Sequence, residues 1–260
     1  MMTEKDKLEL RECCRVLRLS AIAENFEMFA EEETGCQEYL LRLLRAQVEL
    51  KGQKAVEQRI KAAKFPYRKY LEDLETGCMP EGIRKRLPEL TSLDFIRRGQ
   101  NVVFTGNPGT GKIHTAIGLG IKACEAGYKV LFTTVPYLVT ELKETHDQQK
   151  LTAYERKFRN YDLVIADELG YVSFDREGAD LLFNNLSQRV GLKSTIITSN
   201  LSFSDWEQVF GDPAITGAMV DRLTFGAILV DMQGDSYRLR ETIRVNGIDK
   251  AYVMEGKKDA

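Results

Sequence analysis

Residues 101–114 read Asn-Val-Val-Phe-Thr-Gly-Asn-Pro-Gly-Thr-Gly-Lys-Ile-His, a short apolar run followed by a glycine-rich loop and a lysine. The spacing is G-x-x-x-x-G-K, and a helical stretch follows from Ile113 to Ala126. In such a loop the backbone N–H groups curl round a phosphate, the helix dipole adds positive potential, and Lys112 reaches the β- and γ-phosphates. The predicted nucleotide-binding loop consists of Gly106, Asn107, Pro108, Gly109, Thr110, Gly111, Lys112 and Ile113.

The residue after the lysine departs from the usual motif. A phosphate loop normally carries Ser or Thr there, because that hydroxyl ligates Mg²⁺, but this chain has Ile113. Thr115 lies two residues further along the helix and is expected to point to another face. The metal must then take a water molecule, rely on Asp167, or bind more weakly. We predict that nucleotide binding persists while Mg²⁺-dependent hydrolysis is impaired.

Short apolar runs recur along the chain from residue 101 and alternate with amphipathic helices. Continuous apolar runs of this length are typical of strands buried in a parallel sheet of βαβ units. We therefore predict an α/β fold, a P-loop NTPase whose central parallel sheet is flanked by helices, with functional groups at the carboxyl edge of that sheet. The four runs are Val102–Phe104, Val130–Phe132, Leu163–Ile165 and Thr195–Ile197.

Two adjacent acids, Asp167 and Glu168, follow the run Leu163–Ile165. A carboxylate at the end of a buried strand beside a phosphate loop holds Mg²⁺, and a second one orients and polarises the attacking water. We assign Asp167 to the metal and Glu168 to the role of catalytic base. The alternative is a solvated acidic pair that opens a helix, where the helix dipole stabilises acids.

Two later residues are further candidates for catalysis. Asn200 follows the run Thr195–Ile197 and is placed to hydrogen-bond the γ-phosphate or the water, although Asn also forms turns at strand ends. Arg222 follows a helical stretch over Ala214–Val220. It is either an internal salt-bridge partner or an arginine finger offered to the nucleotide of a neighbouring subunit.

The N-terminal part is predicted to be a small all-helical domain. Apolar residues recur three and four apart, which predicts two helices within Cys14–Ala46, interrupted near Gly35, and a third over Val48–Lys64. The expected organisation is a helical domain over residues 1–66, a connector over 67–98, an ATP-binding domain over 99–250 and a tail over 251–260.

This helical part carries a local excess of positive charge. Arg42–Tyr70 holds nine basic residues against two acidic ones, whereas the whole chain has a net charge of −2. Such a patch predicts salt-dependent contacts with DNA phosphates. The alternative is a solvated helix face or a surface for an acidic partner. The DNA-binding candidates are Arg45, Lys51, Lys54, Arg59, Lys61 and Lys64.

Composition and cysteine use exclude several classes of protein. With 43% apolar and 29% charged residues, the chain is neither collagen-like, of low complexity, nor wholly disordered. The five cysteines form no C-x-x-C pair and there are two histidines, so a zinc site is not expected. No signal peptide or apolar run of membrane-spanning length is apparent. We expect reduced thiols, a cytoplasmic location and no membrane contact.

Five stretches of the chain are GNPGTGKIH at 106–114, VIADELGY at 164–171, TSNLSFSDW at 198–206, DRL at 221–223 and GDSYRLR at 234–240. Together they resemble the IstB-type transposition helper ATPases, members of the AAA+ superfamily close to the DnaC-type helicase loaders. The resemblance covers nearly the whole chain. Two residues depart from the family pattern, because Ile113 stands where Thr is usual and Phe225 where His is often found.

The resemblance also implies roles for individual residues. They are phosphate binding for Lys112, the Walker B pair for Asp167 and Glu168, the sensor-I position for Asn200, an arginine finger acting across a subunit interface for Arg222, and a second phosphate sensor or subunit contact for Arg238.

The function implied by the resemblance depends on ATP and DNA. In such proteins ATP-bound subunits form a homo-oligomer on duplex DNA, with nucleotide at the subunit interfaces, and the assembly recruits and stimulates a transposase. The implied cofactors are ATP and Mg²⁺, and the implied activity is ATP hydrolysis. Three alternatives stay open: a DnaC-like helicase loader, a non-hydrolysing ATP-gated DNA scaffold favoured by Ile113, and a P-loop kinase acting on a small molecule.

Overall fold

The computed structural model describes residues 3–30, 35–75, 77, 79–237, 242 and 245. The chain folds into two compact units, Met1–Gln58 and Arg59–Ala260. The domain boundary predicted at residue 66 stays a prediction. No helix in the described part of the chain has both the length and the apolar character needed to cross a membrane.

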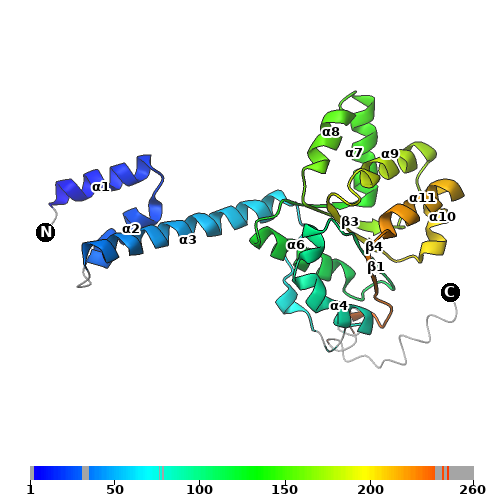
Figure 1. The fold of residues 1–260 in the computed structure, drawn as a ribbon, viewed down its shortest axis with the longest axis horizontal. Coiled ribbons are helices and arrows are strands. Elements are labelled where there is room, and N and C mark those ends of the chain that lie inside the picture. Colours follow the sequence, from blue (N-terminus) through cyan, green and yellow to red (C-terminus); the bar gives the residue numbers. More distant parts are fainter. Residues whose placement is uncertain are drawn as a thin grey trace. The chain divides into compact units, whose positions relative to one another are not determined.

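The first unit is helical (Figure 1), and it contains α1 (Glu4–Val16), α2 (Ser20–Ala30) and most of α3 (Cys36–Ala62). Glu27 of α2 pairs with Lys7 and Arg11 of α1, at 3.0 and 2.6 Å. The buried side chain of Gln47 on α3 accepts the backbone N–H of Ala21 at 3.1 Å. Ion pairs and a buried polar contact therefore connect the three helices.

The structure corrects the predicted helix boundaries in this region. The sequence pattern favours two helices within Cys14–Ala46 and another over Val48–Lys64, whereas α3 runs without a break through residues 46–48. Neither proline nor glycine stands at that junction, so helical hydrogen bonding continues. A break occurs instead between α1 and α2, where Arg18 adopts a left-handed φ of 56°.

The second unit is built on a five-stranded parallel sheet with the order β2-β3-β4-β1-β5. Four strands confirm the four predicted apolar runs. The sequence pattern does not reveal β5, because it is a short edge strand in which buried and exposed residues alternate. The strands are β1 (Val102–Thr105), β2 (Val130–Thr134), β3 (Leu163–Leu169), β4 (Ser194–Ser199) and β5 (Ile228–Asp231).

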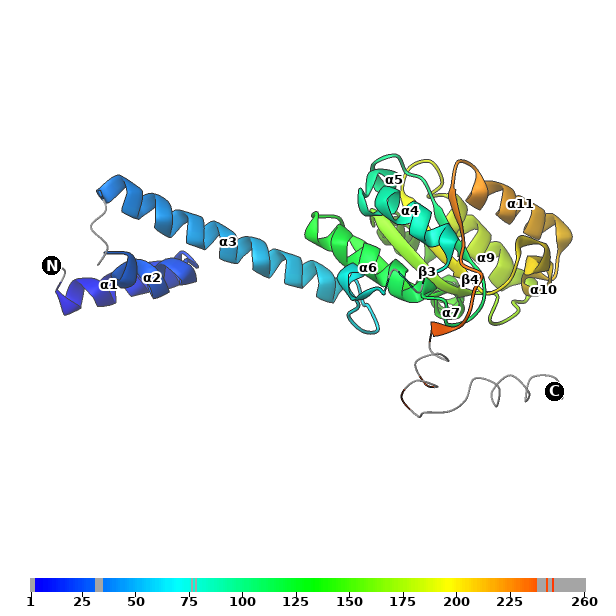
Figure 2. The same cartoon turned by 90° about the horizontal axis from the view of Figure 1, so that it is seen from below.

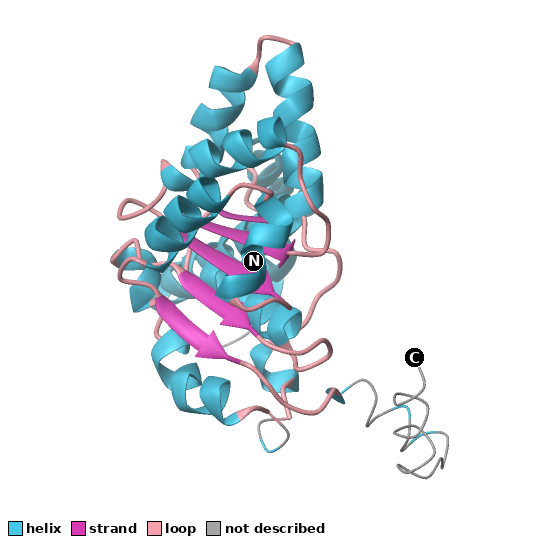
Figure 3. Ribbon diagram, turned by 90° about the vertical axis from the view of Figure 1, so that its right-hand side faces the viewer, coloured by secondary structure: helices cyan, strands magenta, loops and turns pink. Residues whose placement is uncertain are grey.

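Helices cover both faces of this sheet (Figures 2 and 3). Short 3-10 helices occupy Leu71–Asp73 and Phe203–Trp206. The α-helices are α4 (Glu81–Thr91), α5 (Asp94–Arg97), α6 (Lys112–Glu125), α7 (Val135–Asp147), α8 (Leu151–Arg159), α9 (Arg176–Ser187), α10 (Glu207–Phe210) and α11 (Pro213–Thr224).

Neighbouring residues of β3 show how the two faces are divided, because successive side chains of a strand point to opposite sides. Val164 belongs to the core shared with α7, α9 and α11. Ile165 packs against α6 instead, where a Cβ atom at Gly120 would lie 2.8 Å from Ile165 Cδ1. The lack of a side chain at Gly120 therefore allows α6 to lie close to the sheet.

The parallel strands bring the candidate functional residues to one edge of the sheet. β1 leads into the glycine-rich loop and α6, and β4 lies between β1 and β3. The carboxyl ends of these three strands therefore meet. Asp167, Glu168 and Asn200 line one cavity together with Lys112, at the edge where the sequence places them.

Candidate nucleotide-binding site

The glycine-rich loop forms a tight turn between β1 and α6. Gly106 and Gly109 have φ angles of 140° and 80°. A Cβ atom at Gly106 would lie 2.4 Å from the carbonyl carbon of Met232, and one at Gly109 would lie 2.2 Å from the hydroxyl oxygen of Ser236. Glycine is therefore required where the segment after β5 approaches the loop. Because α6 begins at Lys112, the positive end of its dipole faces the loop.

Lys112 is folded into the hollow of this loop. The residue is 7% exposed, and its ammonium donates to the carbonyl oxygens of Gly106 at 2.6 Å and of Asn107 at 2.7 Å. These contacts keep a positive charge beside the backbone N–H groups and the start of the helix, which also favour an anion. The arrangement suits the β- and γ-phosphates of a nucleotide.

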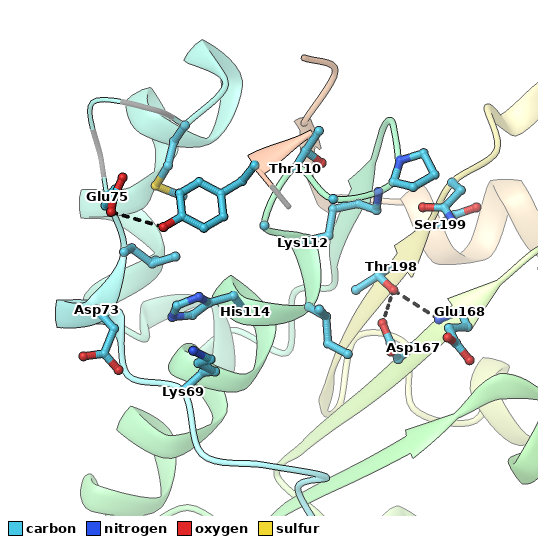
Figure 4. Close-up of a pocket in the computed structure, with 18 of the residues that line it drawn as sticks. Lys69, Asp73, Glu75, Thr110, Lys112, His114, Asp167, Glu168, Thr198 and Ser199 are labelled. Carbon is cyan, nitrogen blue, oxygen red and sulfur yellow. Dashed lines mark hydrogen bonds between the residues drawn. The ribbon is translucent and has the colours of Figure 1, made fainter. Parts of the chain in front are cut away.

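A cavity of about 390 Å³ opens beside the loop. One side is formed by the loop and the start of α6, a second by the ends of β3 and β4, and a third by Tyr237 and the segment between α3 and α4. Figure 4 shows Lys69 and Asp73 across the cavity from Asp167. Parts of the chain that are distant in sequence thus enclose the space next to the phosphate loop.

Asp167 and Glu168 lie inside β3 rather than after its end. The register between β3 and β4 shifts between Ala166 and Leu169, and Glu168 has a left-handed φ of 64°. This irregularity is a β-bulge that re-aims side chains at the sheet edge, and both acids line the cavity. α9 begins only at Arg176, so the interpretation of the two acids as a pair that opens a helix is wrong.

The two acids differ in burial and in hydrogen bonding. Asp167 is 4% exposed, whereas Glu168 is exposed. The hydroxyl of Thr198 donates to a carboxylate oxygen of Asp167 and accepts the backbone N–H of Glu168 at 3.1 Å. Burial raises the pKa of Asp167 above its ordinary value, and the Thr198 hydrogen bond and the positive charge of Lys112 oppose that rise. A bound cation would compensate the buried charge of Asp167.

The cavity offers oxygen ligands that fit Mg²⁺, but one fewer than a usual phosphate loop. Asp167, Glu168 and Thr198 provide carboxylate and hydroxyl oxygens, the hard donors that Mg²⁺ prefers. Ile113 lines the same cavity and has no oxygen in its side chain. Thr115 does not replace it, since its hydroxyl donates at 3.0 Å to a backbone carbonyl one turn back. The donor set therefore fits Mg²⁺, and Asp167 is the buried carboxylate among these oxygen donors.

The other predicted catalytic residues occupy different places. Asn200 follows β4 and lines the cavity with the two acids. Arg222 lies on α11, is exposed, and has its guanidinium carbon 5.1 Å from the ring centroid of Phe183. It is not among the described residues that line the cavity of its own chain. Arg238 lies outside the described residues.

The predicted DNA-binding residues lie along α3 and just after it. The Nζ atom of Lys54 lies 3.4 Å from the hydroxyl of Ser20. Arg59 is half-buried, and its Nε donates at 2.8 Å to the carbonyl oxygen of Cys124 near the end of α6, so this side chain helps to cap that helix. The exposed candidates are Arg45, Lys51 and Lys54 in the first unit and Lys61 and Lys64 in the second.

Sequence patterns do not reveal several residues of the cavity. Thr198 belongs to the polar run that precedes Asn200, but its bonds to the two acids depend on the pairing of β3 with β4. The phenol O–H of Tyr237 donates to a carboxylate oxygen of Glu75 at 3.1 Å, and these residues come from segments far apart in the chain. The one local signal is the hydroxyl of Thr198 beside a strand end, which is common in proteins.

Comparisons with known proteins cover nearly the whole chain. Residues 6–245 match the model of a family described as IstB-like ATP binding protein. The chain is 36% identical over 239 residues to the ATP-binding protein of insertion sequence IS5376 from Geobacillus stearothermophilus, covering 90% of this chain and 95% of that relative. It is 35% identical over 224 residues to the ATP-binding protein of insertion sequence IS21 from Pseudomonas aeruginosa, covering 86% of this chain and 84% of that relative.

Solved structures share the fold over about two thirds of the chain. A crystal structure of DnaI has a TM-score of 0.54 and 17% identity, covering 64% of this chain and 91% of that chain. AMPPCP-bound DnaA from Aquifex aeolicus has a TM-score of 0.53 and 20% identity, covering 69% and 56%. At these identities the likeness concerns the fold alone, and it supports the predicted α/β fold with a central parallel sheet flanked by helices.

Proposed function

Because this chain belongs to the family of IstB-like ATP-binding proteins, we propose that it is the ATP-dependent helper of an insertion sequence, which assembles on target duplex DNA and recruits and stimulates the transposase. The observation that carries the proposal is the similarity, at 36% and 35% identity over 90% and 86% of the chain, to insertion-sequence ATP-binding proteins. We also place the protein in the cytoplasm. The free state of the described cysteines, Cys13, Cys14, Cys36 and Cys124, supports that placement.

In this proposal the residues of the cavity bind ATP and prepare its hydrolysis. The loop N–H groups and Lys112 hold the β- and γ-phosphates, and Asp167 holds Mg²⁺, which when bound neutralises negative charge on the phosphates. Glu168, exposed to the cavity, accepts a proton from the attacking water at its carboxylate. The amide of Asn200 orients that water or the γ-phosphate.

Assembly and DNA binding involve residues outside this cavity. Arg222 is exposed and does not line its own cavity, so we assign it to the nucleotide of a neighbouring subunit. A site completed by a second subunit makes assembly depend on ATP. The exposed basic residues Arg45, Lys51, Lys54, Lys61 and Lys64 bind DNA phosphates in this proposal. Arg59 is less available for DNA phosphates, because its Nε donates to the carbonyl oxygen of Cys124 near the end of α6.

Ile113 favours a second candidate function, an ATP-gated DNA scaffold that does not hydrolyse ATP. The side chain lines the cavity and offers no ligand to Mg²⁺. In such a scaffold ATP binding alone would drive assembly. A helicase loader is the other alternative from the sequence. Co-purification with the transposase of the same insertion sequence or with a replicative helicase distinguishes a transposition helper from a loader.

The hydrolytic part of the proposal is tested by phosphate release on long duplex DNA. Lys112→Ala serves as the blank and Ile113→Thr as the comparison, because it restores the usual hydroxyl. We expect the wild type to exceed the blank and Ile113→Thr to be faster by about tenfold, a typical effect for groups around a metal. Equal rates for the wild type and Ile113→Thr would contradict the role given to position 113.

Two further outcomes separate the candidates. Wild-type rates equal to the Lys112→Ala blank, with recovery in Ile113→Thr, would identify the scaffold and remove the ATPase assignment. Rates equal to the blank in both proteins, under conditions where both bind ATP, would show that the acid pair does not act in hydrolysis.

A further inference from the structure

We propose that the Thr198 hydroxyl partly compensates for the hydroxyl that is missing at position 113. In this role Thr198 is a positioning residue: it holds Asp167 for Mg²⁺ and fixes the backbone that directs Glu168 into the cavity. The inference rests on the ATP site of the proposed function and is independent of DNA and transposase binding.

The first support is the set of contacts made by one hydroxyl group. It donates to a carboxylate oxygen of Asp167 and accepts the backbone N–H of Glu168 at 3.1 Å (Figure 4). Thr198 is 3% exposed, so water has little access to these bonds. A buried carboxylate requires a hydrogen-bond donor, and a hydrogen bond to a charged group is among the stronger ones. One side chain thus connects both members of the acid pair.

The second support is the position of Thr198 in the sheet. β4 lies between β1 and β3, and Thr198 is the register partner of Phe104, two residues before the loop begins at Gly106. On its other side lies the β3 bulge, where Asp167 and Glu168 leave the regular register. Thr198 therefore stands between the strand that leads into the phosphate loop and the two acids.

The third support is the backbone of Glu168. Its φ of 64° lies in the left-handed region, which is strained for a residue with a side chain. Such a conformation persists where surrounding contacts impose it. The bond from the Glu168 N–H to Thr198 is one such contact. Without the hydroxyl, both the carboxylate of Asp167 and the N–H of Glu168 would lose a partner.

The test uses Thr198→Val, which keeps the shape of the side chain and removes the hydroxyl, and Thr198→Ser, which keeps the hydroxyl. The affinity of a fluorescent ATP analogue is measured with Mg²⁺ and with EDTA, so the readout does not depend on turnover. In Thr198→Val we expect the gain in ATP-analogue affinity caused by Mg²⁺ to be about tenfold smaller than in the wild type. The affinity measured in EDTA should be unchanged. Thr198→Ser should behave as the wild type.

The most discriminating experiment combines Thr198→Val with Ile113→Thr, which restores a hydroxyl after the lysine of the phosphate loop. Adding Ile113→Thr to Thr198→Val should restore most of the lost Mg²⁺ effect, whereas adding it to Asp167→Asn should not. Thr195→Val is the matched control, because it removes a buried hydroxyl of the same strand that accepts from Arg189 Nε at 3.4 Å and does not line the cavity. It should leave the Mg²⁺ effect unchanged.

Several results would overturn the inference. If Thr198→Val loses the same ATP-analogue affinity in Mg²⁺ and in EDTA, the role of Thr198 is generally structural. If the gain in affinity caused by Mg²⁺ is the same as in the wild type, Thr198 has no role in metal binding. A wild type whose affinity does not respond to Mg²⁺ would also refute it, as would failure of Ile113→Thr to rescue. If Thr198→Val does not fold, Thr198→Ala gives the same comparison. A wild type that binds ATP with Mg²⁺ but does not bind DNA would refute the proposed function and leave this inference standing.

Discussion

Gly106 is the residue of the phosphate loop on which the packing around the loop depends most clearly. The atoms that a side chain would meet there belong to the backbone at Met232, 2.4 Å from the position of a Cβ atom. Backbone atoms cannot move aside as the end of a flexible side chain can. The φ of 140° adds strain for any other residue. The loop and the segment after β5 are therefore fitted to each other.

We predict that Gly106→Ala lowers the free energy of unfolding by more than about 1 kcal/mol and abolishes binding of a fluorescent ATP analogue. Gly217→Ala is the matched control, because Gly217 lies inside α11, where a Cβ atom would meet nothing within 4 Å beyond the backbone of its own helix. There alanine should be neutral or stabilising by up to about 1 kcal/mol. Urea unfolding measures both, and similar effects of the two substitutions would contradict the role given to Gly106.

At the scale of elements, two nearby basic residues of α3, Arg59 and Lys61, have different surroundings. Arg59 donates at 2.8 Å to the carbonyl of Cys124 near the end of α6, while Lys61 is exposed. A side chain that caps a helix contributes to stability, whereas an exposed lysine is available for a phosphate. The two residues are two positions apart in the chain, and the sequence alone does not distinguish them.

We predict that Arg59→Ala lowers the free energy of unfolding by about 1.5–3 kcal/mol, the effect of losing a hydrogen bond from a charged group, and changes DNA affinity little. Lys61→Ala should leave stability within about 0.5 kcal/mol and lower DNA affinity, with the slope of log K against log salt reduced by about 1. Chemical denaturation and DNA titrations at several salt concentrations check this. A reduced slope with unchanged stability in Arg59→Ala would reverse the assignment.

The elements also show which parts of the fold a sequence can predict. The runs that form β1 to β4 carry a local signal, since buried strands are continuously apolar. The edge strand β5 and the unbroken α3 do not, because alternation over four residues and the absence of a helix breaker are weak signals. Asp167 and Glu168 are predictable from their position after an apolar run. Thr198 is not, because its role depends on how β4 pairs with β3.

At the scale of the whole molecule, ATP binding and DNA binding are assigned to different parts of the chain. The phosphate loop follows β1 and the acids lie within β3, both in the second unit. The exposed basic candidates lie on α3 and just after it, with Arg45, Lys51 and Lys54 in the first unit and Lys61 and Lys64 in the second. Arg222 is exposed and does not line its own cavity. A neighbouring subunit that contributes Arg222 would connect these functions, because the nucleotide would then control assembly.

ATP-dependent binding of labelled duplex DNA, with the mass of the complex determined in the same experiment, tests this central claim most directly. The wild type should form complexes of several subunits on DNA with ATP and Mg²⁺, and weaker, salt-sensitive complexes without nucleotide. Lys112→Ala should show the weak binding under both conditions, and Arg222→Ala should bind ATP without assembling. Equal DNA affinity and equal mass with and without ATP in the wild type would contradict the claim.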